Sequence, residues 1–240
     1  MRALRRASLR LALLLALVMV AGAFSAASPA PAAHAAIAQP AESRCVETCV
    51  NVPSTPQAAA QKLMEYYNSG ALVIEWAERD IIPAEIKPIA NGTISQTPQC
   101  NIDLRTLQTL VIMIRNYGSV QVSDLNRHCA NDGVATCASN PTSRHCTPPG
   151  ATTAMDLTYI GSLRTRGNDG ATNILLSFLD SFMPAGSRAG QAANSDGCGS
   201  YGMPALSNIS RFADYCTHIH VDFGSTTAGL RGLTTRWTTS

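Results

Sequence analysis

The chain has 240 residues, with 18 Lys and Arg against 16 Asp and Glu, so its formal net charge is only +2. Four arginines and no acidic residue precede residue 36, so the remaining chain has 14 basic and 16 acidic side chains, a net charge of −2. A chain so close to neutral has no excess of positive charge, which argues against nucleic acid or an anionic membrane surface as a partner.

The first 35 residues have the pattern of a secretory signal peptide. Arg2 to Arg10 form a basic segment, an uncharged apolar run over 11–20 follows, and this run is short for a bilayer span. Ala33-His34-Ala35 supplies an A-x-A cleavage site; a site near Ala26 and an uncleaved anchor are the alternatives. We therefore expect a secreted protein, extracellular or associated with the cell wall, without stable membrane insertion after cleavage.

All eight cysteines follow residue 35. An even number of cysteines in an exported chain indicates disulfides, up to four here, and the sequence does not fix their connectivity. Cys45 and Cys49 are close enough in the sequence to pair locally. A metal bound by cysteines is the alternative, but no C-x-x-C pair is present to favour it.

Helices and short strands follow one another along the mature chain. Apolar spacing and end signals predict helices over 58–67, 103–117 and 172–183, and a short helix among the turns of 81–99. Strands are predicted at 71–76, 119–123, 153–160 and 217–223, with a short ordered element at 209–212. Residues 128–152 and 185–204 are predicted to be long loops. This pattern indicates an α+β domain over 100–240, with a lead-in and helical segment over 36–99 packed on it.

Two histidines on the last predicted strand are candidates for chemistry. His218 and His220 alternate with Ile219 and Val221, so both imidazoles are expected on one face of the strand. Such histidines can also be purely structural. Other metalloenzyme folds also contain H-x-H-x-D, but they take further ligands from long downstream sequence, and only 18 residues follow Asp222. Any other metal ligands are therefore expected upstream.

His145 and Asp156 are the best upstream source of ligands. Imidazole and carboxylate suit zinc, and with one C-terminal histidine they give three protein ligands and an open fourth position, as in catalytic zinc sites. Zinc in such a site activates water and polarises a carbonyl group.

Three motifs then resemble the family of zinc D-Ala-D-Ala carboxypeptidases and peptidoglycan endopeptidases, which shares its fold with the hedgehog signalling domain. Ser143-Arg144-His145, Ala154-Met155-Asp156 and His218-Ile219-His220 match its S-x-H, A-x-D and H-x-H motifs in order, within roughly Asp103 to Phe223. The resemblance implies a small antiparallel sheet with flanking helices, to which the cysteines add disulfide-stapled loops. It also implies a monomeric zinc peptidase that hydrolyses peptidoglycan stem peptides.

The resemblance also implies roles for individual residues. His145, Asp156 and His220 would bind Zn2+, and His218 would lie beside the metal as a base or a stabiliser of the transition state. Asp214, six residues before His220, would act as a general base, although a solvated loop carboxylate is an equal alternative.

Arg127 matches the arginine that follows a strand in this family. It would bind the terminal carboxylate of the substrate or a developing oxyanion, or it is an ordinary surface residue. Asp222 would hold an imidazole in place, or cap a turn at the surface.

The interval between His145 and Asp156 is longer than in the family's H-x-x-G-x-A-x-D. Residues 146–153 could bulge as a loop held through Cys146, or block and reshape the cleft. A non-catalytic module that binds peptidoglycan or a protein on the same zinc-bearing fold is therefore the alternative function. A disulfide-stapled extracellular protein without metal is a third.

Overall fold

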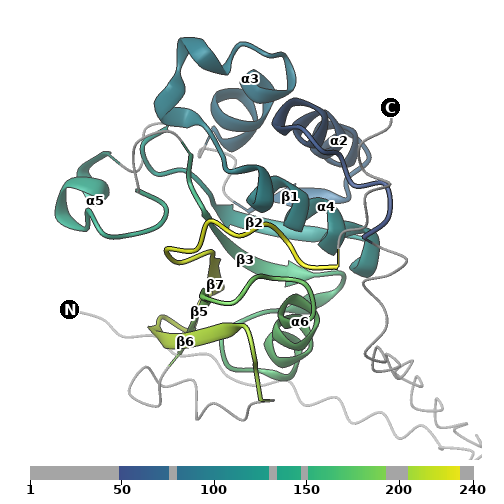
Figure 1. Ribbon diagram of the computed structural model, residues 1–240, viewed down its shortest axis with the longest axis vertical. Coiled ribbons are helices and arrows are strands. Elements are labelled where there is room, and N and C mark those ends of the chain that lie inside the picture. Colours follow the sequence, from purple (N-terminus) through teal and green to yellow (C-terminus); the bar gives the residue numbers. More distant parts are fainter. Residues whose placement is uncertain (1–48, 76–79, 130–133, 147–150, 193–204, 233–240) are drawn as a thin grey trace, which may run out of the picture. The chain divides into compact units, whose positions relative to one another are not determined.

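The computed structural model describes residues 49–75, 80–129, 134–146, 151–192 and 205–232 (Figure 1). They all belong to one compact unit, Gln39–Ser240. In this part of the chain, no helix has both the length and the apolar character needed to cross a membrane. The expected signal peptide, Cys45 and Cys198 lie outside the described residues.

Capping residues set the ends of the three main helices. The side chains of Thr55, Asp103 and Asp169 each accept a hydrogen bond from a backbone N–H in the first helical turn. These caps begin α2 (Pro56–Asn68), α4 (Leu104–Tyr117) and α6 (Gly170–Asp180). Gly118 ends α4 with a φ of +82°, a conformation that glycine adopts without strain. The three helices predicted from the sequence are confirmed.

Within the described ranges, five shorter helical segments lie among the turns: η1 (Ile81–Ile86), α3 (Lys87–Ala90), η2 (Ile94–Gln96), η3 (Pro98–Cys100) and α5 (Val134–Ser139). The prediction of a short helix within 81–99 is confirmed, whereas α5 falls in a segment predicted to be a loop. Two disulfides, Cys100–Cys129 and Cys137–Cys146, link these segments to the region around His145. Cys49 and Cys216 are disulfide-bonded as well.

Seven strands form one sheet: β1 (Leu72–Ile74), β2 (Val120–Asp124), β3 (Ala154–Ile160), β4 (Leu163–Arg164), β5 (Ser187–Ala192), β6 (Ile209–Asp214) and β7 (Ile219–Asp222). Their order is β1-β2-β3-β7-β5-β6 (Figure 1). Strand β4 pairs with β3. The α+β class is confirmed.

The prediction of an antiparallel sheet is wrong in part, because β1 pairs with β2, and β5 with β6, in parallel. A tight turn cannot join parallel neighbours, and the connection from β1 to β2 accordingly contains α4. The prediction of a loop over 185–204 is wrong at β5. Its Gly and Ala residues have low strand propensity, but β7 and β6 pair with it on both sides.

The sheet has an apolar face and a polar face. Met155 and Leu157 of β3 and Ile219 and Val221 of β7 belong to one buried core that includes residues of α4 and α6. Side chains alternate between the two faces of a strand, so the residues between these point to the opposite face. Asp156 of β3 and His220 and Asp222 of β7 therefore share the polar face. His218, immediately before β7, contacts Asp156.

Candidate metal centre

Strand pairing forms the base of the centre. β3 and β7 are antiparallel, with Asp156 directly opposite His220. Asp124 of β2 pairs with Asp156 on the outer side, and Gly190 of β5 pairs with His220 on the other. Side chains of opposed residues start only about 5 Å apart on the same face. The residues of the centre on the sheet therefore lie in one row that crosses β2, β3, β7 and β5.

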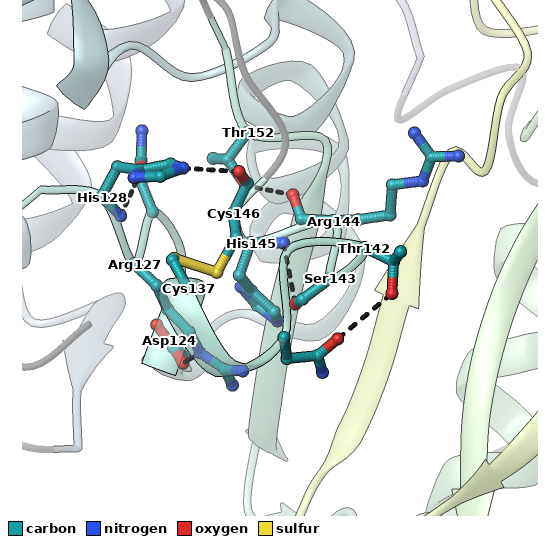
Figure 2. The surroundings of a disulfide bond; sticks show 12 residues. Asp124, Arg127, His128, Cys137, Thr142, Ser143, Arg144, His145, Cys146 and Thr152 are labelled. Atoms are coloured by element: carbon teal, nitrogen blue, oxygen red, sulfur yellow. Dashed lines mark hydrogen bonds and ion pairs between the residues drawn. A yellow bond between two sulfur atoms is a disulfide. The ribbon is translucent and has the colours of Figure 1, made fainter. Parts of the chain in front are cut away.

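His145 reaches Asp156 from the loop before β3. Figure 2 shows this loop around the Cys137–Cys146 disulfide. The hydroxyl of Ser143 accepts a hydrogen bond from the backbone N–H of His145 at 3.3 Å, and the carbonyl of His145 accepts one from the N–H of Arg127 at 3.0 Å. The Cys137–Cys146 disulfide ties the next residue to α5. These contacts fix the position of a candidate ligand that is on neither a helix nor a strand.

Three donor atoms converge at the centre. His145 Nε2 lies 3.0 Å from Asp156 Oδ1 and 3.0 Å from His220 Nδ1, and the last two atoms are 2.8 Å apart. All three residues are buried, and together they could hold a metal ion. Bonds of about 2.0–2.1 Å in a tetrahedron separate two ligand atoms by about 3.3 Å, so only a small expansion is needed.

Each imidazole has one nitrogen that faces the centre and one that faces away from it. The hydrogen bond of the nitrogen that faces away (the outer nitrogen) determines whether the nitrogen that faces the centre (the inner nitrogen) carries a proton or a lone pair. His145 Nδ1 faces the carbonyl oxygen of Leu125 at 2.5 Å, and His220 Nε2 faces Asp222 Oδ2 at 2.9 Å. Both partners can only accept, so when a ring is neutral its outer nitrogen carries the proton and its inner nitrogen directs a lone pair to the centre. With the Asp156 carboxylate, the centre presents three acceptors, which fits a cation.

Electrostatic interactions shift three pKa values at the centre. Burial lowers the pKa of His220, but hydrogen bonds to Asp156 and Asp222 outweigh it and raise the pKa to about 9. Burial raises the pKa of Asp156, but the charge of His145 and the other nearby histidines hold it well below its usual range. The pKa of Asp222 is lowered too, because its contacts with His220 and Arg188 outweigh burial. A proton on His220 Nδ1 and a metal ion thus compete for one position.

His218 and Asp214 lie beside the three donors. His218 Nε2 is 3.5 Å from Asp156 Oδ2 and 3.8 Å from Asp214 Oδ2. The side chains of His218 and Asp214 are 17% and 20% exposed, whereas the three donors are buried. The structure therefore brings both residues to the solvent-facing side of the centre, where the sequence predicts groups that act on a substrate.

Arg127 also lies at the centre, held between two carboxylates. Its Nε donates to Asp124 Oδ2 at 2.5 Å, and its Nη2 donates to Asp156 Oδ2 at 3.2 Å. The guanidinium group therefore fixes the oxygen of Asp156 that does not join the three donors. Binding of a substrate carboxylate by Arg127 stays a prediction.

Residues of β5 and β6 that the sequence does not predict complete the site. A Cβ atom on Gly190 would lie 2.9 Å from the Cβ of His220 and 2.4 Å from Asp214 Oδ2, so only glycine fits between them. The ring of Phe212 meets the His220 ring edge to face at 5.5 Å. Arg188 binds Asp222 through two hydrogen bonds. The Gly- and Ala-rich sequence of β5 resembles a loop, so these residues carry no clear local signal.

Comparison of the chain with protein-family models, with curated proteins and with solved structures finds no match. Function is therefore inferred from the chemistry of the centre and from the sequence motifs that supply it.

Proposed function

We propose that the protein is a zinc-dependent peptidase that hydrolyses stem peptides of peptidoglycan, as a D-Ala-D-Ala carboxypeptidase or an endopeptidase. The observation that carries the proposal is the convergence of His145 Nε2, Asp156 Oδ1 and His220 Nδ1 within 2.8–3.0 Å of one another. Two imidazoles and one carboxylate are a common donor set for catalytic zinc, and they leave a fourth position for water or substrate.

A bound zinc ion would polarise the carbonyl group of the scissile peptide bond. Asp214 is partly exposed and lies 3.8 Å from His218; in this proposal it would accept a proton from the attacking water. His218 Nε2 lies between the carboxylates of Asp214 and Asp156, and Thr217 Oγ1 is 2.9 Å from its Nδ1. The imidazole is thus oriented to donate a proton to the leaving amine or to stabilise developing negative charge.

The choice of peptidoglycan as substrate is supported by the three motifs that match the peptidase family and by the expected signal peptide. A secreted enzyme meets the cell wall directly. Arg127 adds a cationic group beside the centre, although Asp124 and Asp156 already neutralise part of its charge.

Metal analysis combined with a hydrolysis assay tests the proposal. The purified mature protein should contain about one zinc ion per chain and should cleave muropeptides that end in D-Ala-D-Ala, or cross-linked muropeptides, as followed by mass spectrometry. Asp156→Ala and His220→Ala should lose both zinc and hydrolysis. Glu65→Gln, on the exposed surface of α2, is the control that should keep both.

Full hydrolysis by protein stripped of metal would refute the proposal. Stoichiometric zinc without hydrolysis of either substrate would instead favour the alternative of a non-catalytic module that binds peptidoglycan or a protein. Absence of metal from the folded wild-type protein, even after incubation with zinc, would favour a disulfide-stapled extracellular protein.

A further inference from the structure

We propose that Asp222 and Arg188 are positioning residues, which hold His220 with Nδ1 toward the metal centre and thereby set the affinity for the metal. Neither residue belongs to the group of three donors. The identity of the ion, zinc, rests on the proposed function; the positioning itself rests on the contacts described below.

Asp222 is fully buried, and both of its carboxylate oxygens are engaged. Oδ2 is 2.9 Å from His220 Nε2 and accepts a second hydrogen bond from Arg188 Nη2 at 2.8 Å. Oδ1 accepts from Arg188 Nε at 3.0 Å and from the backbone N–H of Gly224 at 2.5 Å. A carboxylate held at both oxygens cannot rotate freely, so its hydrogen bond fixes the direction of the imidazole.

The contacts close into a ring of four side chains. The guanidinium carbon of Arg188 lies 5.2 Å from the centroid of the Phe212 ring, and Phe212 in turn contacts the His220 ring at 5.5 Å. The imidazole is therefore held at Nε2 by a hydrogen bond and on one side by an aromatic ring. A half-turn about its Cβ–Cγ bond would direct a carbon atom to the centre and leave the buried Asp222 without its imidazole partner.

Strand register explains why this arrangement forms on β5. Arg188 lies opposite Asp222 and Gly190 lies opposite His220. The missing side chain at Gly190 leaves room for the His220 ring, and Arg188, two residues earlier, points to the same face. One strand thus supplies both the space for the ligand and the cation that holds its hydrogen-bonding partner.

A purely structural ion pair is the competing explanation. Buried ion pairs contribute little net stability, because desolvation offsets their attraction, whereas partners of metal-bound histidines typically change metal affinity 10–100-fold when mutated. The two explanations therefore predict different effects of a substitution. A positioning role predicts a change in metal affinity while the fold is kept, whereas a purely structural ion pair predicts a change in stability alone.

The experiment measures zinc affinity by competition with a chromophoric chelator, and records the visible absorption spectrum of the Co2+-substituted protein. Asp222→Asn should weaken zinc binding by about 10–100-fold and alter the Co2+ spectrum. Arg188→Lys keeps the charge but loses the two parallel hydrogen bonds, so it should shift both readouts in the same direction. Arg164→Lys, at an exposed position of β4 in the same sheet, is the matched control and should change neither.

Wild-type zinc affinity and Co2+ spectrum in a folded Asp222→Asn protein would overturn the proposal, whatever its melting temperature. If Asp222→Asn does not fold, Arg188→Lys decides: wild-type affinity in that variant overturns the proposal, and weakened affinity supports it. These readouts concern metal binding and not turnover. A wild-type protein that binds zinc but hydrolyses no peptide would therefore refute the peptidase activity and leave this result standing.

Discussion

Gly190→Ala is the substitution whose effect the structure determines most sharply. Gly190 lies between His220 and Asp214, and an added Cβ would sit 2.9 Å from the Cβ of each residue and 2.4 Å from Asp214 Oδ2. Ordinary contacts begin near 3.4 Å, so both neighbouring strands must move by about 0.5 Å. The Asp214 carboxylate can rotate away, but the two Cβ atoms are fixed to strands β6 and β7.

The expected cost is about 1–3 kcal/mol of unfolding free energy, the usual range for overpacking. For a domain of this size the melting temperature should fall by about 2–4 °C per kcal/mol, which calorimetry or circular dichroism will detect. Metal–ligand distances usually stay within about 0.2 Å of their ideal values, so a displaced His220 should also lower zinc affinity. Chelator competition measures this second effect separately from stability.

Gly229→Ala is the matched control, because a Cβ at Gly229 would meet no atom within 4 Å and its backbone φ is not positive. It should leave the melting temperature and zinc affinity close to those of the wild type. A Gly190→Ala protein that is as stable as this control, with equal zinc affinity, would show that β5 does not confine His220 as described.

Three further predictions concern proton binding and catalysis at the centre. Because the pKa of His220 is raised to about 9, zinc must displace a proton from His220 at any pH below that value. The apparent zinc affinity should therefore fall by about tenfold per pH unit as the pH decreases from 8 to 6.5. A zinc affinity that is independent of pH in that range would contradict this prediction. The stability of the metal-free protein should have the opposite pH dependence. The stabilisation by the charged His220 is complete below pH 6.5 and is lost as the pH rises through about 9. Denaturation curves recorded in the presence of a chelator measure this loss. His218→Gln should keep zinc, because His218 lies outside the three donors, but should lower kcat by about 10²–10⁴-fold; unchanged kcat would remove His218 from the mechanism.

The three residues that could hold a metal ion were identified from the sequence because local motifs mark them. The alternation of His218, Ile219, His220 and Val221 predicts a strand with both imidazoles on one face. The observed strand β7 begins at Ile219, and His218 lies just before it, 3.5 Å from Asp156. On β3, Asp156 likewise lies between two core residues, Met155 and Leu157. Which nitrogen of each ring faces the centre could not be predicted, because that depends on acceptors distant in sequence, such as the Leu125 carbonyl at His145.

The role of Asp222 could not be predicted from the neighbouring sequence. Its position two residues after His220 is compatible both with a partner for the imidazole and with a cap at the surface. In the structure Asp222 is buried, not at the surface. Its Oδ2 contacts His220 Nε2, its Oδ1 accepts from the backbone N–H of Gly224, and Arg188 of β5 binds both oxygens. Since β5 has few strand-forming residues, no local sequence pattern predicts that Arg188 pairs with Asp222.

The sequence by itself determined the main helices, the α+β class and the three residues that converge at the centre, because side-chain periodicity, caps and short motifs are local properties of the chain. The tertiary structure alone decided the parallel pairs of the sheet, the register that sets Asp156 and Gly190 on either side of His220, and the contacts of Arg188 with Asp222. These depend on which distant strands pair and at what offset. That choice is made by burial and backbone hydrogen bonding summed over the whole core, and no short stretch of sequence contains it.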